Sequence, residues 1–148
     1  QHMQTSSRGW GRALCCLALV VGLCVPAASV AAGGRRVAVE MTWLQAATGE
    51  RAALTRFIRL NWLAMDAIAT RQGLMRDYRL LENAGESGSW DVLVIVSYHD
   101  ERGYAGIASA FEAIRARHQT VLVDGKDLSN LGKIVRSERS YEDVTAPD

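Results

Sequence analysis

Between residues 36 and 44 every second side chain is a large apolar one, and this alternation predicts a β-strand with two different faces. The apolar face carries Val37, Val39, Met41 and Trp43, while the other carries Ala38, Glu40 and Thr42. After Thr48 the apolar spacing changes to three and four, which predicts a helix that ends near Gln72, before Gly73. The stripe of this helix contains Leu54, Phe57, Ile58, Asn61, Trp62, Met65, Ile68 and Ala69.

A β-hairpin is predicted to follow this helix. Residues 74–83 form its first strand, the Gly- and Ser-rich residues 84–89 its turn, and residues 90–98 its second strand. Residues 92–96 are an unbroken apolar run, which needs cover on both faces of the sheet. The second strand of the hairpin is therefore expected to be central.

The rest of the chain predicts a second helix and a last strand. Asp100 can cap the helix, whose apolar stripe contains Tyr104, Ile107, Phe111, Ile114 and His118. A short extended piece over residues 120–123 and a turn at Asp124-Gly125 are expected before a last strand over residues 132–141. The tail, residues 142–148, is expected to be frayed and flexible.

The predicted order of elements is β-α-β-β-α-β, within a single domain over residues 33–141. This order indicates an α+β, ferredoxin-like fold, in which two helices cover one face of a four-stranded antiparallel sheet. The other face stays open in a monomer, and burial of apolar surface contributes roughly 25 cal/mol per Å². We therefore expect a homodimer in which two sheets pair face to face and form an α+β barrel.

The N-terminal residues have the three parts of a secretory signal peptide. Residues 1–2 are interpreted as a cloning remnant, and residues 3–32 combine a charged start, the apolar run 13–25 and a small-residue cleavage site near Ala31 and Ala32. The apolar run is shorter than the roughly 20 residues that a membrane-spanning helix needs, although an uncleaved anchor remains the alternative. We expect a periplasmic or secreted protein with no stable membrane association after cleavage.

Cysteine and charge content exclude several kinds of site. Cys15, Cys16 and Cys24 all lie in the predicted signal peptide, so the mature domain has no disulfide and no cysteine-ligated metal. The chain has 17 Lys and Arg against 16 Asp and Glu, and removal of Arg8 and Arg12 with the signal peptide leaves a net charge of about −1. Without a basic cluster, nucleic-acid binding is not expected. The sequence also has no phosphate-loop or dinucleotide motif, so neither a cofactor nor a metal is expected.

The order of elements, together with Asn61-Trp62, residues 90–98 and Gly103-Tyr104, resembles the dimeric α+β barrel superfamily over about residues 35–141. This superfamily includes antibiotic-biosynthesis-type monooxygenases, EthD-like proteins and stress-responsive barrel proteins. Its haem-degrading members use an Asn on the first strand and a Trp and a His on the second helix. The present chain departs from that pattern, with Glu40 and Thr42 on the first strand and no Trp on the second helix.

Six residues are candidates for a binding or catalytic site. Four of them are predicted to line a barrel cavity: Glu40, Thr42, Ser97 and His99. Glu40 and His99 are also candidates for proton transfer, since a buried carboxylate or an imidazole can act as a general base. The alternatives are an ion pair of Glu40 with an arginine such as Arg76, and a loop position for His99.

The other two candidates interrupt apolar stripes. Asn61 is either a ligand residue or a hydrogen-bond partner of nearby backbone, and His118 is either a ligand residue or a packing or capping residue near a helix C-terminus. Three functions fit these patterns. The first is a small-molecule-binding barrel for a partly apolar ligand, the second a cofactor-independent monooxygenase-like enzyme, and the third a structural or assembly protein whose barrel is filled by side chains such as Leu93 and Ile95.

Overall fold

A computed structural model of the protein describes residues 34–85 and 88–144. The predicted cloning remnant, the predicted signal peptide and the tail beyond residue 144 lie outside these residues. Within the described ranges, no helix has the length and hydropathy that spanning a bilayer requires.

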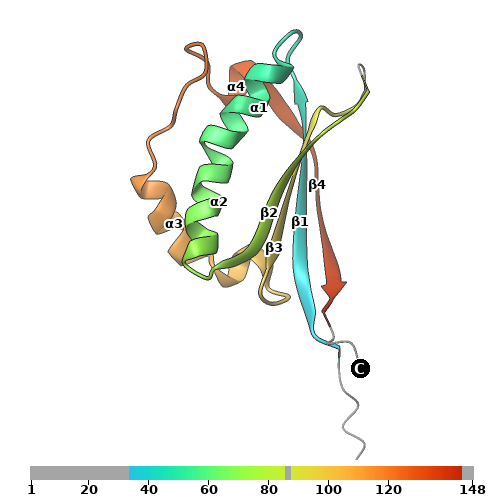
Figure 1. Cartoon of the computed structure of the whole chain (residues 1–148), viewed down its shortest axis with the longest axis vertical. Helices are drawn as coiled ribbons and strands as arrows, with labels where there is room; N and C mark the ends of the chain where they lie inside the picture. Colours follow the sequence, from blue (N-terminus) through green and yellow to red (C-terminus); the bar gives the residue numbers. More distant parts are fainter. Residues whose placement is uncertain (1–33, 86–87, 145–148) are drawn as a thin grey trace, which may run out of the picture. The chain divides into compact units, whose positions relative to one another are not determined.

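Four antiparallel strands form one sheet in the order β2-β3-β1-β4. The strands are β1 (Arg36–Ala46), β2 (Met75–Glu82), β3 (Val92–Tyr98) and β4 (Gly132–Asp143). The main helices are α1 (Arg51–Leu60), α2 (Trp62–Arg71) and α3 (Ala108–Arg117), and all three lie on one face of the sheet (Figure 1). This strand order with cover on one side is the ferredoxin-like α+β fold, and β3 is a central strand, as predicted.

The first predicted helix is divided at Asn61. The Asn61 side-chain Nδ2 donates a hydrogen bond to the Phe57 carbonyl at 2.9 Å. The same carbonyl also accepts the helical hydrogen bond from the Asn61 backbone N–H at 3.0 Å. A side chain that bonds back to the preceding turn competes with the helical hydrogen bonds and bends the helix. The prediction of one continuous helix is therefore corrected to α1 and α2, which meet at this residue.

The second predicted helix begins later than expected. Asp100 accepts from the Arg102 N–H at 2.9 Å, which is a local turn and not a helix cap. Gly103 follows in the left-handed region at φ +62°, so the chain cannot be α-helical there. A 3₁₀ turn, η1 (Gly103–Gly106), therefore precedes α3.

The segment after α3 holds one more helix than the sequence pattern indicated. Residues 120–123 do not form a strand; only the single bridge between Val123 and Lys126 is present, around the predicted turn at Asp124-Gly125. Helix α4 (Leu128–Leu131) then begins where the Asp127 side chain accepts from the Asn130 N–H. Strand β4 continues to Asp143, beyond the predicted end.

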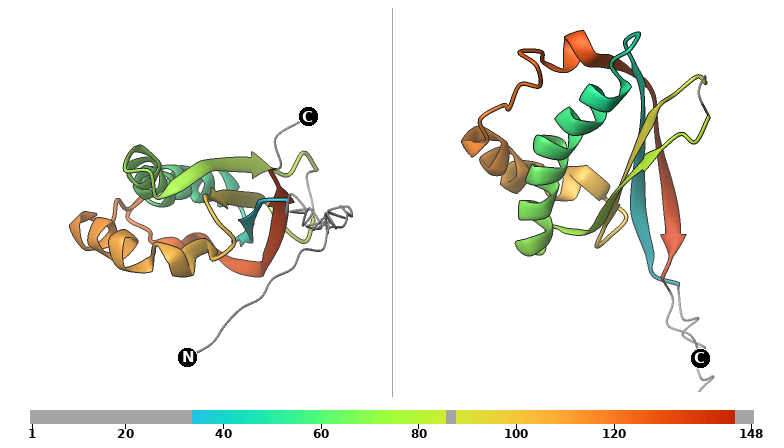
Figure 2. Two further views of the ribbon diagram at one scale, coloured as in Figure 1. Left: turned by 90° about the horizontal axis from the view of Figure 1, so that it is seen from below. Right: turned by 45° about the horizontal axis from the view of Figure 1, so that its top comes forward.

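The core between helices and sheet consists of two clusters. One surrounds Leu44 of β1, Leu54 and Ile58 of α1, and Leu131 of α4. The other surrounds Tyr98, Phe111 and neighbouring side chains of α2, α3 and the sheet. Figure 2 shows the corresponding helices over the same sheet face from two further directions. A cavity lies where the two clusters meet.

Strand β4 is an exposed edge of the sheet. Every residue after Gly132 is exposed along its length. An exposed edge invites pairing with other chains, and charged side chains along it oppose such pairing. The edge carries Lys133, Arg136, Glu138, Arg139 and Glu142.

Candidate functional site

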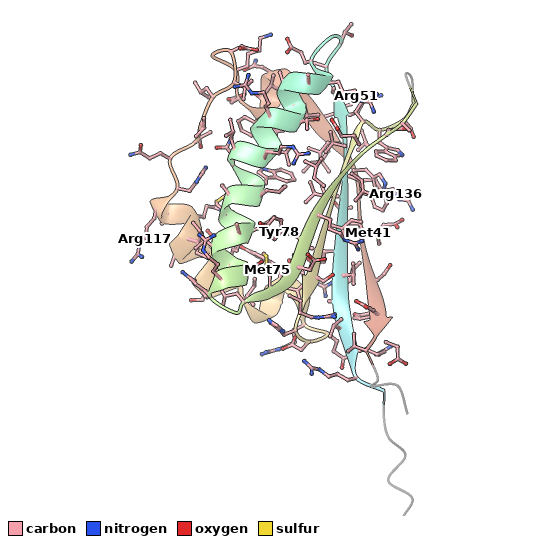
Figure 3. All side chains as sticks on the ribbon, viewed as in Figure 1. Met41, Arg51, Met75, Tyr78, Arg117 and Arg136 are labelled. Carbon is pink, nitrogen blue, oxygen red and sulfur yellow. The ribbon has the colours of Figure 1, made fainter. Side chains whose placement is uncertain are left out.

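The candidate site is a cavity of about 430 Å³ between the sheet and helices α2 and α3. It exists because β1 presents short or polar side chains, Ala38, Glu40 and Thr42, to the helices at this level, where larger apolar side chains would fill the space. The walls are mainly apolar and aromatic: Trp62, Met65, Met75, Val94, Val96, Tyr98, Tyr104 and Phe111. Figure 3 shows Met75 on this side, between α2 and the sheet. Glu40, Thr42, Asp66 and Arg115 add polar groups.

Glu40 is held in the cavity wall by several donors. Its Oε2 accepts from the Tyr98 hydroxyl at 2.8 Å, and its Oε1 accepts from the Arg139 Nη2 at 2.6 Å and from the Tyr104 N–H at 3.4 Å. The predicted ion-pair partner Arg76 is instead bonded to Glu142 at 3.2 Å. The partner of Glu40 is Arg139, because the two residues face each other across the β1–β4 pair.

Gly103 brings the backbone of η1 against this carboxylate. A Cβ added at Gly103 would lie 2.7 Å from the Glu40 Oε1 and 3.2 Å from the Ala38 Cβ. Only a residue without a side chain allows this approach at φ +62°.

Replacing Gly103 by alanine is therefore expected to lower the free energy of unfolding by about 2–4 kcal/mol, through backbone strain and displacement of Glu40. Gly49→Ala is the matched control, since Gly49 also has a positive φ, +77°, but open space around it. The control should lose only about 1–2 kcal/mol in the free energy of unfolding, because it introduces backbone strain without crowding. Urea denaturation of both variants checks the difference, and equal losses would show that crowding of Glu40 is unimportant.

Asp66 is the second acidic group of the cavity and projects from α2. The residue is only 6% exposed, and its side chain has no hydrogen bond or ion pair to the rest of the described chain. In the described ranges, every solvent-inaccessible side-chain nitrogen or oxygen has a hydrogen-bond partner. Because Asp66 has none, its carboxyl oxygens must be accessible from the cavity that the residue lines. Burial raises the pKa of Asp66 from 3.8 to about 7.

Tyr98 lies between the two acidic groups. Its pKa is raised by burial, by its hydrogen bond to Glu40 and by the negative charges of Glu40 and Asp66. The hydroxyl therefore stays protonated at neutral pH and keeps donating to Glu40. The site thus combines a firmly held carboxylate, a neutral phenol and an acid with a pKa near 7.

The four predicted lining residues do not share one face of the sheet. Glu40 and Thr42 line this cavity between sheet and helices, whereas the prediction placed them in the cavity of a dimeric barrel. Ser97 belongs to the opposite face, because Val39 is opposite Ser97 while Glu40 is opposite Val96, and His99 follows the end of β3 outside the cavity lining. The prediction that these four residues line one space is therefore wrong for Ser97 and His99.

Asn61 and His118 lie together but away from the cavity lining. The His118 Nε2 is 2.9 Å from the Asn61 Oδ1, which also accepts from the Val121 N–H at 2.7 Å. The Asn61 Nδ2 donates to the Val121 carbonyl at 2.9 Å. This arrangement fixes the segment after α3 to the α1–α2 junction, and His118 is the C-cap of α3, the capping position that the sequence offered as one alternative.

Sequence reasoning missed Asp66, Tyr98, Tyr104, Arg115 and Arg139 as parts of the site. Asp66 could have been found, since it lies four residues after Trp62 and three before Ala69 on the same stripe. Arg139 could not, because its role depends on the pairing of β1 with β4. In the described part of the chain no group of three or more His, Cys, Asp or Glu side chains could hold a metal ion.

Comparisons with known proteins give structural likeness alone. No protein-family model matches the sequence, and no curated protein is significantly similar to it. A solved protein structure from Pseudomonas aeruginosa is similar, with 18% identity and a TM-score of 0.43 over 76% of this chain and 96% of that chain. A dimeric protein of unknown function and ferredoxin-like fold from Bacteroides fragilis is also similar, with 9% identity and a TM-score of 0.41 over 73% of this chain and 95% of that chain.

Proposed function

We propose that the protein is an exported homodimer that binds a small, partly apolar molecule in the cavity between its sheet and helices. The observation that carries this proposal is a space of about 430 Å³ with mostly apolar walls and an unpartnered buried acid, Asp66. Ligand sites are typically concave and apolar, with a few polar groups that orient the ligand. An unpaired buried acid reduces stability, which is more readily explained by a ligand than by folding.

Native mass spectrometry of protein purified from bacterial cells tests ligand binding. We expect a component of small-molecule mass that is retained by the wild-type protein and lost from Val96→Phe, because Val96 lines the cavity and a larger side chain would fill it. Val121→Phe is the control, since Val121 is 43% exposed and outside the cavity lining. Wild-type protein without any bound component, and without any fragment hit in a thermal-shift screen, would contradict the binding function.

A proton-transfer enzyme is the second candidate function, and Asp66 supports it. A group with a pKa near the working pH is best suited to act as general acid or base. Asp66, rather than Glu40 or His99, would then be the general acid or base, because it faces the cavity without a hydrogen-bond or ion-pair partner. An enzyme would lose turnover in Asp66→Asn while it still binds its substrate, whereas a binding protein would show no turnover at all.

Pairing of two sheets through the open face supports the homodimer. Apolar side chains of β1 and β3 point away from the helices there, including Val39, Met41, Trp43 and Ile95. Figure 3 shows Met41 and Arg136 on this side of the sheet. The Arg136 guanidinium lies 4.5 Å from the centre of the Trp43 ring, so it covers part of the face. The assembly-protein alternative, with Leu93 and Ile95 filling the space between two sheets, belongs to this same face.

Met41→Arg is expected to convert the dimer into a monomer, because it places a charge in the middle of the proposed apolar interface. Leu60→Arg is the control, since Leu60 is 40% exposed on helix α1. Light scattering measures the mass of both variants and of the wild type. A wild-type monomer would contradict the dimer, and so would a Met41→Arg dimer of unchanged stability.

Export to the periplasm or the medium is proposed from residues 3–32 alone. Cell fractionation, with and without these residues, tests it. We expect the protein to remain in the cytoplasm when they are removed.

A further inference from the structure

The acidic groups of the cavity differ in how far their charge is compensated. Glu40 has the Arg139 guanidinium 2.6 Å away and the Tyr98 hydroxyl 2.8 Å away. Asp66 has no charged or hydrogen-bonding partner in the described chain, although it is 6% exposed. The cavity therefore contains one acid whose charge nothing in the fold compensates.

We infer that the cavity takes a small primary amine with an aromatic body, whose ammonium group pairs with the Asp66 carboxylate. This inference rests on the proposed binding function and specifies its ligand class. An ionised carboxylate in an apolar site requires a partner, and an ammonium group provides both the opposite charge and hydrogen-bond donors. An anionic ligand would instead face two acidic side chains, Glu40 and Asp66.

The other charged and titratable groups around the cavity leave Asp66 as the site for a cation. Arg139 is bonded to Glu40, and Arg115 is paired with Glu112 at 3.3 Å, with 57% of its side chain exposed. The Tyr104 hydroxyl donates to Glu112 at 2.6 Å, and this bond and burial raise the pKa of Tyr104. Tyr98 is likewise neutral, so the two tyrosines add no charge.

The walls and the volume suit an aromatic amine. Trp62, Tyr98, Tyr104 and Phe111 line the cavity with aromatic rings, and a cation over the face of such a ring gains about 0.5–2 kcal/mol. A volume of about 430 Å³ lies at the small end of the range for ligand sites. A compact monoamine fits these limits better than an extended polyamine.

Binding of an ammonium group must be coupled to the protonation of Asp66. The pKa of this group is about 7, so at low pH the site holds a proton that the amine has to displace. Amine affinity should therefore rise about 30-fold from pH 5.5 to pH 8 and change little above pH 8. A neutral alcohol of the same shape needs no ionised Asp66 and should show no such rise.

Isothermal titration of the purified chain with tryptamine and with its alcohol analogue tryptophol tests the inference. We expect tryptamine to bind at least tenfold more tightly than tryptophol at pH 8, with the pH dependence above. In Asp66→Asn this preference should disappear while tryptophol still binds; Asp77→Asn, which changes an exposed acid on β2, should behave as wild type.

Three outcomes would overturn the inference. Equal binding of both compounds at pH 8, or a preference that survives in Asp66→Asn, would reject the amine and leave the binding function standing. Absence of binding by either compound at every pH would also reject the aromatic amine. The binding function itself would fail only if native mass spectrometry and the fragment screen were negative as well.

Discussion

Replacing Asp66 by asparagine is expected to stabilise the protein at pH 8, by roughly 2–4 kcal/mol in the free energy of unfolding. The pKa of Asp66 is about 7 in the folded protein against 3.8 ordinarily, so between these values the folded state holds a proton that the unfolded state has released. Stability therefore falls as the pH rises from about 4 to 7, and the full cost remains above pH 7. A neutral asparagine removes this cost.

Urea denaturation at pH 4 and pH 8 measures the effect. At pH 4 Asp66 is protonated in the folded state and somewhat less than half protonated in the unfolded state, so the variant should differ from wild type by only about 0.5 kcal/mol. Asp77→Asn, at a side chain that is 58% exposed, should change little at either pH. Destabilisation of Asp66→Asn at pH 8 would mean that the carboxylate has a partner in the folded protein.

Replacing Asn61 by alanine is expected to lower the free energy of unfolding by about 3 kcal/mol. The side chain is 3% exposed and makes hydrogen bonds to Phe57, His118 and both backbone groups of Val121. Truncation leaves the N–H and the carbonyl of Val121 without their partner and releases the segment after α3. Hydrogen exchange at the Val121 amide should therefore become faster in the variant.

His118→Ala and Asn130→Ala provide graded controls for this result. His118 shares one of the hydrogen bonds of Asn61, so its removal should cost only about 1 kcal/mol. Asn130 is exposed on α4, and its replacement should have an effect within about 0.5 kcal/mol. Equal losses for Asn61→Ala and His118→Ala would show that the bonds to Val121 contribute little.

The sheet could be predicted from local patterns because a strand shows its two faces in every second residue. The alternation in β1 and the apolar run in β3 gave both strands, and the order of elements gave the ferredoxin-like fold. Helix boundaries were less accurate where tertiary contacts decide them. Asn61 divides α1 from α2, because its side chain bonds to the Phe57 carbonyl and to the distant Val121. Gly103 delays α3, because it adopts a left-handed conformation where it packs against Glu40.

The site was harder to predict than the fold because it depends on register and on the placement of helices. Alternation alone grouped Glu40 with Ser97, whereas the pairing of Glu40 with Val96 puts Ser97 on the other face. The position of Asp66 on the apolar stripe of α2 indicates burial, but only the packing of α2 over the sheet reveals that it faces a cavity. A volume that side chains leave empty has no signature in any single segment.

The pairing of β1 with β4 also determines when the domain can fold. Arg36 pairs with Asp143, so the first strand obtains one of its two neighbours only from the last strand of the chain. Sheets dominated by such distant pairs fold slowly, within milliseconds to seconds, because the connecting loop must close first. A chain emerging from the ribosome therefore cannot complete this sheet until β4 has been synthesised, and until then one edge of β1 has no partner strand.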